Sequence, residues 1–416
     1  MDVVDVIYYI FILCSLFFTS FFLLLFLTAR NKIWREKLAE HPKSLTVLVP
    51  AFNEEKSIAG TLEHIMSANF PRNLLEVLVL NDGSTDRTRE IAQAFADKYP
   101  RNIKVINKPN SGKADSLNFG IKKAKGFYIA VVDADSYPSR DAFLLMQGFF
   151  EREEGVGGVT ANIKIRKIGN FIQKLQDLEY TTIVWVRKLL QYVDGIYATP
   201  GPLSMYTKEA IEKIGGFDTK NMTEDIEIAW RLLYHRYKIR MSLNSEVTTE
   251  APTTFKKWWN QRVRWGLGGV QTTLKYRRTF LRKNYGTLGI FVAPFFVLSY
   301  ALTHTGFTVM LYRIFGETIY GAYYSLSTGY WGVGKGVANF VNLPNSFTFF
   351  LLLLLIMTIF YVGFAFRSMG NTNYFNIRKG GFLVVAFYLT VYVLMTPIIL
   401  LAVLYRLVRG NYKWWG

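Results

Sequence analysis

Acidic side chains follow three short apolar runs in the first third of the chain. They are Glu54 and Glu55, Asp82 and Asp86, and Asp133 and Asp135. Taken one at a time, such residues are ordinary helix caps and turn residues. Gathered in one place, however, carboxylates repel one another unless a cation joins them. Oxygen ligands of this kind suit Mg²⁺ or Mn²⁺, so the pattern predicts a divalent-metal site able to hold a diphosphate.

Short apolar runs alternate with amphipathic stretches between about residues 44 and 251, and they predict the elements that position these acids. The predicted strands are Leu45–Val49, Leu75–Leu80, Ile103–Ile106 and Phe127–Val132, and the predicted helices are Thr85–Tyr99 and Ala114–Lys125. Strands separated by helices indicate a mostly parallel α/β sheet. Ligands bind beyond the carboxyl ends of such strands, so all three acidic motifs are expected to line one crevice. No GxxxxGK[ST] motif is present, which argues against a P-loop nucleotidase.

Two further groups of reactive side chains lie later in the chain. Thr223-Glu224-Asp225 begins a predicted helix over Glu224–Tyr234, with Thr223 as its N-cap. A carboxylate in a first turn either complements the helix dipole or serves as a general base. In Gln261-Arg262-Val263-Arg264-Trp265, helical spacing puts Trp258, Arg262 and Trp265 on one face. Trp258 and Trp259 are typical of an anchor at the lipid headgroups.

Hydrophobic composition indicates a membrane protein. Half of the 416 residues are hydrophobic and 16% are aromatic, which excludes a disordered chain. Val6–Ala29 is uncharged and exceeds the roughly 20 residues that span a bilayer. Three later spans are predicted at Gly286–Phe315, Phe347–Phe366 and Phe382–Tyr405. The expected organisation is therefore a transmembrane helix (1–30), a catalytic domain (44–251), interfacial helices (252–285) and a C-terminal transmembrane region (286–416).

Charge predicts the orientation in the membrane. The net charge of +18 fits either nucleic acid or an anionic membrane face, and the basic residues cluster beside the apolar spans. We therefore expect membrane lipids as partners and no nucleic acid. Acidic residues precede the first span and basic residues follow it, which predicts an outside N-terminus and a cytoplasmic catalytic domain at the plasma membrane. Four spans would put the C-terminus outside, whereas Arg406, Arg409 and Lys413 argue for inside, so its side stays open.

The chain contains few cysteines and histidines, the residues that form disulfides and bind transition metals. Cys14 is the one cysteine, which excludes an intrachain disulfide and a cysteine-based zinc site. The four histidines are scattered along the chain, which argues against a histidine-bound metal.

The motifs VPAFNEE, NDGSTD, GKADSLNFG, DAD, TED and QRVRW, in this order, resemble those of the membrane-bound family 2 glycosyltransferases. These include cellulose, chitin, hyaluronan and poly-N-acetylglucosamine synthases. The resemblance covers about Ser44–Trp265. It implies a Rossmann-like α/β domain of the GT-A type with transmembrane and interfacial amphipathic helices, Mg²⁺ or Mn²⁺, and UDP-N-acetylglucosamine or UDP-glucose as donor. TPGPLSMY (199–206) resembles the acceptor-side loop of hyaluronan synthases, whereas TED is the form of the other synthases, so the polymer stays open.

Roles for individual residues follow from the same resemblance. It implies that Asp133 and Asp135 hold the metal and the diphosphate, and that Asp225 is the catalytic base. The implied nucleotide-sugar-binding residues are Glu54, Asp82, Lys113, Asp133, Gln261 and Arg264. The implied acceptor-side residues are Gly201, Glu224 and Trp265.

The implied reaction is displacement at an anomeric carbon. The metal and Arg264, whose fork pairs with phosphate oxygens, would meet the charge on the leaving diphosphate. Asp225 would take the proton of the attacking hydroxyl. Attack from one face predicts inversion, so an α-linked donor would give a β linkage.

Three interpretations of the acceptor and of the protein's class stay open. In the leading one, a growing polysaccharide is extended and exported through the membrane helices, with an oligomer or an accessory chain completing a channel. In the second, one sugar is transferred to a membrane lipid. The third is a non-catalytic transporter or binding protein, and the lack of carboxylates and lysines in the predicted spans argues against an ion-coupled transporter.

Overall fold

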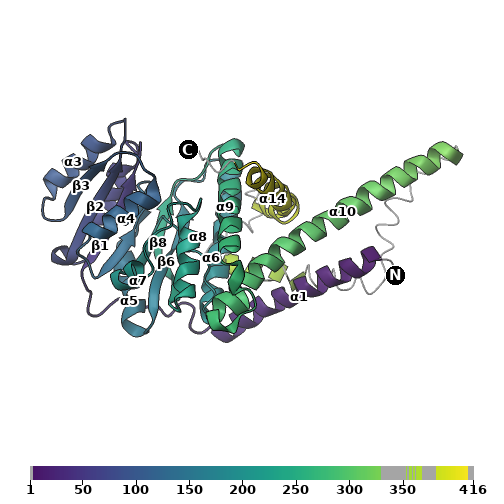
Figure 1. The fold of residues 1–416 in the computed structure, drawn as a ribbon, viewed down its shortest axis with the longest axis horizontal. Coiled ribbons are helices and arrows are strands. Elements are labelled where there is room, and N and C mark those ends of the chain that lie inside the picture. The colour runs from purple at the N-terminus through teal and green to yellow at the C-terminus, as the bar shows by residue number, and fades with distance from the viewer. Residues whose placement is uncertain are drawn as a thin grey trace.

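The computed structural model describes residues 3–328 and 381–410, together with part of 353–367. An α/β domain occupies one end of the protein, and two long helices, α1 (Val3–Ala29) and α10 (Ala293–Thr328), extend away from it (Figure 1). The two helices pack together near the domain, where the rings of Phe18 and Phe295 lie 5.3 Å apart.

A mixed eight-stranded sheet forms the centre of the domain, in the order β3-β2-β1-β4-β7-β6-β8-β5. Its strands are β1 (Leu45–Ala51), β2 (Leu75–Asp82), β3 (Ile103–Lys108), β4 (Tyr128–Val131), β5 (Ser136–Pro138), β6 (Val156–Ile165), β7 (Ser204–Thr207) and β8 (Lys238–Thr249). The first four strands are parallel, as predicted. β7 is antiparallel to both β4 and β6, and β8 is parallel to β6 and antiparallel to β5. The expectation of a mostly parallel sheet is therefore wrong for its second half.

Helices cover both faces of the sheet. Those of the domain are α2 (Ile58–Met66), α3 (Thr88–Lys98), α4 (Lys113–Lys123), α5 (Ala142–Arg152), α6 (Phe171–Leu190), α7 (Lys208–Lys213) and α8 (Glu224–Tyr234). Along β1, Val47 and Val49 pack in the cluster that contains Leu62 of α2, whereas Leu48 packs in the cluster that contains Leu117 of α4. Because side chains alternate along a strand, burial of both faces requires the continuous apolar runs seen in the sequence.

The predicted helices of the domain are confirmed with small shifts at their ends. The predictions Thr85–Tyr99 and Ala114–Lys125 correspond to α3 and α4, and Glu224–Tyr234 is α8. Thr223 occupies the N-cap position of α8, but its side chain makes no capping hydrogen bond. Short helical turns cover Arg72–Leu74, Gln191–Val193, Arg277–Thr279 and Lys283–Tyr285.

Two described helices are long and apolar enough to cross a membrane, Tyr9–Ala29 and Leu288–Val309. A third candidate is Leu383–Tyr392 with Leu394–Val408, which meet at a bend of 42°. These three overlap the first, second and fourth predicted spans, while half of the third, Phe347–Phe366, lies outside the described residues. The second candidate begins with a π-helical turn (Leu288–Val292) that leads into α10. The third consists of α13 (Gly381–Phe387), a π-helical turn (Tyr388–Tyr392) and α14 (Val393–Val408).

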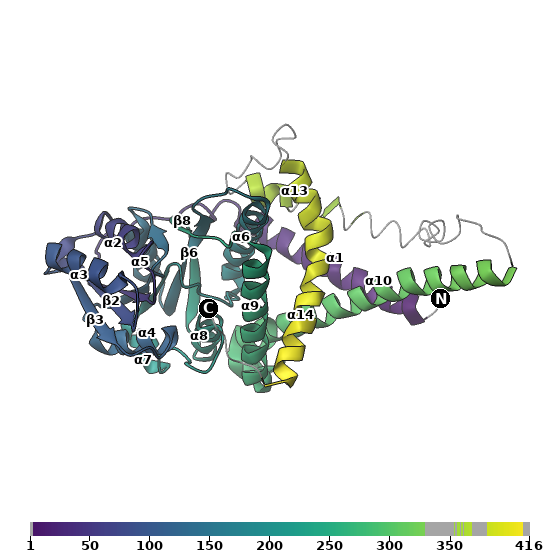
Figure 2. The same ribbon diagram turned by 90° about the horizontal axis from the view of Figure 1, so that it is seen from above.

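Helix α9 (Phe255–Lys275) lies between the domain and the C-terminal helix α14 (Figure 2). Its residues Val263 and Leu267 pack with Leu400 and Val403 of α14. Trp258, by contrast with the predicted headgroup anchor, is buried inside the protein and its ring lies 5.4 Å from that of Tyr392. This part of the interfacial interpretation is therefore wrong.

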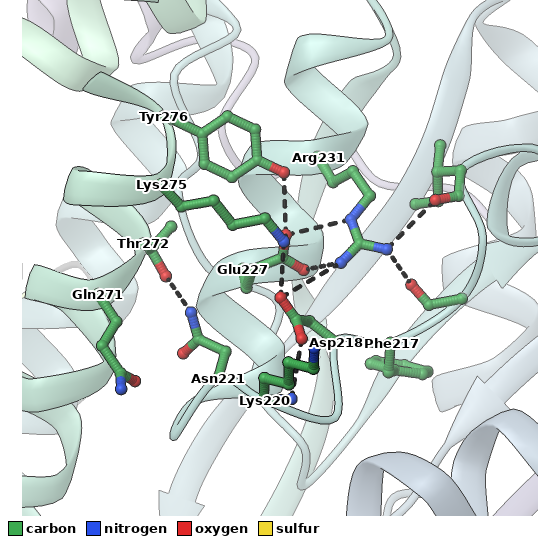
Figure 3. A network of polar contacts seen from close by, with 12 residues as sticks. Phe217, Asp218, Lys220, Asn221, Glu227, Arg231, Gln271, Thr272, Lys275 and Tyr276 are labelled. Atoms are coloured by element: carbon green, nitrogen blue, oxygen red, sulfur yellow. Dashed lines mark hydrogen bonds and ion pairs between the residues drawn. The ribbon is translucent and has the colours of Figure 1, made fainter. Parts of the chain in front are cut away.

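A buried polar network joins α8 to the end of α9 (Figure 3). The Glu227 side chain is fully buried and accepts hydrogen bonds from Arg231 Nη2 at 2.5 Å, Lys275 Nζ at 2.6 Å and the Tyr276 hydroxyl at 2.9 Å. Lys275 Nζ also lies 2.6 Å from Asp218 Oδ2. Because Glu227 lies on α8 and Lys275 on α9, these bonds fix the two helices against each other.

The same two segments also meet at the start of α8. Asn221 Nδ2 donates to Thr272 Oγ1 at 2.9 Å. A Cβ at Gly268 would lie 1.9 Å from Thr223 Oγ1, so only glycine lets α9 approach this closely. Helix α9 therefore holds the backbone that leads into Asp225.

We expect Glu227→Gln to destabilise the fold, because it removes the buried charge that Arg231 and Lys275 share and leaves them only Asp218. Breaking a buried ion pair costs about 3–5 kcal/mol. Thermal unfolding of the purified protein in detergent measures this as a lower unfolding temperature.

A matched control is Glu212→Gln, the same substitution in a half-exposed pair with Lys208 at 3.7 Å. Exposed pairs contribute roughly 0–1 kcal/mol, so this variant should unfold close to the wild type. Equal unfolding temperatures for the two variants would contradict the role given to the network.

Candidate active site

A cavity of about 320 Å³ lies where the end of β4, the segment 197–202, the start of α8 and helices α6 and α9 meet. Most of the predicted site residues line it: Lys113, Asp133, Asp135, Gly201, Glu224, Asp225, Gln261, Arg264 and Trp265. The fold thus brings together motifs from five separate parts of the chain. Glu54 and Asp82 do not line this cavity.

Lys113 bridges two of the cavity's carboxylates. Its Nζ lies 2.6 Å from Asp133 Oδ1 and 3.0 Å from Glu224 Oε1. Burial acts to lower the pKa of Lys113, but the two carboxylates outweigh burial and raise it. At Glu224 burial acts to raise the pKa of the carboxyl, but Lys113 and then Arg264 together outweigh burial and lower it. A Cβ at Gly201 would lie 2.4 Å from Lys113 Nζ, so the bridge requires glycine at this position.

Asp225 lies in the first turn of α8 and faces the cavity. Its Oδ1 accepts a hydrogen bond from the Ile226 amide at 2.9 Å, and its backbone oxygen accepts one from the Thr199 amide at 3.1 Å. Burial and then the Glu224 charge raise the pKa of Asp225 to about 6, against the opposite effect of nearby cations. A carboxylate with a pKa this close to neutrality is suited to accept a proton from a hydroxyl.

Asp133 and Asp135 form the acidic side of the cavity directly after β4. The Asp133 amide donates to the Gly201 oxygen at 3.2 Å, which ties the motif to the segment 197–202. Burial, followed by the charges of Asp133 and Glu54, raises the pKa of Asp135 to about 6. A cation between Asp133 and Asp135 would relieve this repulsion, so the pair fits one divalent ion.

A complete metal-ligand set is not formed by protein side chains alone. Within residues 3–328, 381–410 and the described part of 353–367, no group of three or more His, Cys, Asp or Glu side chains could hold a metal. Further oxygen ligands would have to come from a bound diphosphate and water, as is usual for Mg²⁺ sites.

The Asp82 carboxylate, at the end of β2, is bound by the end of β3 and the loop that follows it. The carboxylate accepts hydrogen bonds from Lys108 Nζ at 2.6 Å, the Ser111 amide at 3.0 Å and the Gly112 amide at 2.8 Å. These bonds fix the turn that leads into Lys113. In this structure Asp82 positions the lysine that bridges the cavity.

The first two acidic motifs are joined to each other by hydrogen bonds. The Thr85 amide donates to Asn53 Oδ1 at 2.9 Å, and the Glu55 amide donates to Asp86 Oδ2 at 3.1 Å. Glu54 accepts a hydrogen bond from Ser57 Oγ at 2.5 Å. These hydrogen bonds hold the two motifs together outside the lining of the cavity, and their place in a wider crevice stays a prediction.

Helix α9 supplies the side of the cavity opposite the sheet. The predicted shared face is confirmed, because the Arg262 guanidinium lies 5.3 Å from the Trp258 ring and 4.4 Å from the Trp265 ring. Arg262 forms a buried ion pair with Glu179 of α6. The Trp265 ring stacks on Tyr180 of α6, with centroids 6.3 Å apart and planes inclined by 25°.

Sequence analysis missed the contribution of α6 and the loop after it. Tyr180, Val184, Arg187 and Tyr197 all line the cavity. Their signal in the sequence is weak, since an arginine between apolar residues in TTIVWVRKLL is typical of any amphipathic helix.

Comparison with known proteins supports the interpretation of these motifs. The model of glycosyl transferase family 2 matches residues 46–215. The probable glycosyltransferase YdaM of Bacillus subtilis (strain 168) is 32% identical over 278 residues, which are 66% of each chain. The poly-beta-1,6-N-acetyl-D-glucosamine synthase of Staphylococcus epidermidis is 33% identical over 241 residues, 57% of this chain and 58% of the synthase. The chain therefore spans less than two thirds of these relatives.

The fold also resembles that of a solved glycosyltransferase. The mannosyltransferase PcManGT from Pyrobaculum calidifontis, in complex with GDP-Man and Mn²⁺, superposes with a TM-score of 0.56 over 86% of this chain and 97% of its own, at 19% identity. This likeness shows the mixed GT-A-type sheet that the motifs implied. The protein thus contains a glycosyl transferase family 2 domain.

Proposed function

We propose that the protein is an inverting, metal-dependent glycosyltransferase that extends a β-linked polysaccharide from a UDP-sugar at the cytoplasmic face of the plasma membrane. The observation that carries this proposal is that one cavity holds the Asp133–Asp135 pair, Arg264 and Asp225. Such a cavity offers a place for a metal and a diphosphate on one side and a general base on the other.

The donor would bind on the side of β4. Asp133 and Asp135 would hold Mg²⁺ or Mn²⁺, and the ion would offset the charge on the leaving diphosphate. Arg264 and Lys113 are the cavity's cations for the phosphates, and Gln261 lies beside them. The solved relative binds GDP-Man with Mn²⁺, and a curated relative is named for an N-acetylglucosamine polymer, which supports a nucleotide sugar as donor. Within this proposal the expected donors are UDP-N-acetylglucosamine and UDP-glucose.

The nucleoside would lie beyond this cavity, toward the first two acidic motifs. Glu54 lies close enough to Asp133 for the two side chains to interact. Burial raises the pKa of Glu54, and the charge of Asp133 raises it further. We retain Glu54 as a nucleoside contact, whereas Asp82 would act through the turn it holds.

The acceptor would bind on the side of α6 and α9. Asp225 would remove the proton from its hydroxyl as that oxygen attacks the anomeric carbon. Trp265 and Gly201 line the same cavity, and an aromatic ring suits the C–H face of a sugar. Glu224 would act through its ion pair with Lys113.

The membrane helices suggest where the product goes. Tyr9–Ala29 and Leu288–Val309 would cross the bilayer with the N-terminus outside, and α14 packs on α9 beside the cavity. Even the four spans predicted from the sequence are few for a sugar channel, so export would need an oligomer or an accessory chain.

The size of the product tests this proposal. We expect purified protein in lipid vesicles, given Mg²⁺ or Mn²⁺ and labelled UDP-sugars in turn, to make a high-mass polymer from one donor, and a metal chelator to stop it. Label found only in a lipid extract would replace the polysaccharide with a lipid acceptor. No transfer from any UDP-sugar would overturn the proposal.

We expect Asp225→Asn to fold but to lose transfer by about 100-fold or more, because general bases contribute roughly 10²–10⁴ in rate. Binding of UDP should persist. Asp97→Asn, the same substitution at an exposed site on α3, should transfer like the wild type. Transfer at the wild-type rate by Asp225→Asn would exclude this residue as the base.

The rate of transfer should rise with pH through about 6. The raised pKa keeps Asp225 protonated, and therefore unable to act as a base, at lower pH. Measurement of turnover between pH 5 and 8 checks this. Donor and metal are kept saturating, because a bound cation keeps Asp133 and Asp135 ionised, so that their titration does not affect the profile. A flat profile over a range in which the protein stays folded would contradict it.

A further inference from the structure

Arg187 is a buried cation on the cavity wall that no motif assigns. It lies near the end of α6, its side chain lines the cavity, and the residue is only 4% exposed. Its Nε and Nη1 are buried and find no hydrogen-bond partner among the described residues. Buried charged groups are almost always paired, because an unpaired one keeps the whole cost of its desolvation. Such an arginine is arranged for a partner that arrives from the cavity.

Neighbouring buried cations show that this lack of partners is exceptional here. Lys188, the next residue, pairs with Glu36 at 2.8 Å and donates to the Met241 oxygen at 2.8 Å. Arg262, equally buried on the opposite helix, pairs with Glu179. The fold therefore supplies an ion pair to each of these two cations, whereas no ion pair to Arg187 is formed within the part of the chain that the structure describes.

The surroundings of Arg187 separate it from the diphosphate side. Burial lowers its pKa, and the charge of Asp225, alone among the cavity's carboxylates, acts against this, together with Tyr197 and Tyr180. Asp225 is thus a carboxylate whose charge acts on Arg187, and Tyr180 and Tyr197 line the cavity with it.

We propose that Arg187 binds the acceptor sugar: its guanidinium donates hydrogen bonds to oxygens of that sugar, hydroxyl or acyl carbonyl, and so orients the attacking hydroxyl toward Asp225. This inference rests on the proposed function. Aromatic walls suit the C–H faces of a sugar, and a guanidinium offers two donors in a fixed fork to its oxygens. A site built to hydrogen-bond a substrate oxygen also rejects acceptors that lack it, because the donors are then left unpaired.

The test compares Arg187→Met and Arg187→Lys with Lys174→Met, an exposed control on the same helix. Transfer to soluble β-linked oligosaccharides of the donor's sugar, hydrolysis of the donor without acceptor, UDP binding and thermal unfolding are measured for each. We expect Arg187→Met to raise the acceptor KM at least tenfold, with UDP affinity within twofold of the wild type and donor hydrolysis retained. Arg187→Lys should recover part of the loss, since it restores one donor.

Unfolding of the free protein gives a readout that a structural role would not produce. Because methionine removes an unpaired buried charge, Arg187→Met should unfold at the same temperature as the wild type or a higher one. A lower unfolding temperature would overturn the inference, and so would an unchanged acceptor KM or a parallel loss of UDP affinity. Failure of the proposed function is distinguishable, because the wild type itself would then transfer no sugar.

Discussion

The candidate site depends on the two ion pairs of Lys113. One joins this lysine to Asp133 at the end of β4, and the other joins it to Glu224 at the start of α8. Residues far apart in the chain, the proposed metal ligands and the proposed base, are thereby held at one cavity. The pairs form because the Asp82 carboxylate fixes the turn before Lys113 and because position 201 has no side chain to obstruct them.

The second constraint is the contact between α8 and α9. Glu227, buried and bound by residues of both helices, keeps the start of α8 in place, and α9 brings Arg264 and Trp265 to the same cavity. Helix α9 also packs on α14, one of the candidate membrane-spanning segments. The geometry of the site is thus linked to the packing of a candidate membrane-spanning helix, as the proposed export of the product would require.

The sequence predicts those strands and helices that a single local pattern determines. β1 to β4 are continuous apolar runs because both faces are buried, and α8 has the predicted bounds. The second half of the sheet could not be predicted, because β6 pairs with β8, which lies some eighty residues later, without a regular alternation of strands and helices. The site shows the same division. Motif residues meet at one cavity. The hydrogen bonds of Asp82, and the lack of partners for Arg187 Nε and Nη1 among the described residues, come from tertiary packing that spacing does not encode.

The most direct measurement is a structure of the protein in lipid with UDP and Mn²⁺ bound. If one cavity serves both the donor and the base, the ion should contact Asp133 and Asp135, and the diphosphate should contact Lys113 or Arg264. Asp225 should then face the part of the cavity left open for an acceptor. A nucleotide bound away from this cavity, or one whose diphosphate displaces Asp225 from it, would contradict a single site for both halves of the reaction.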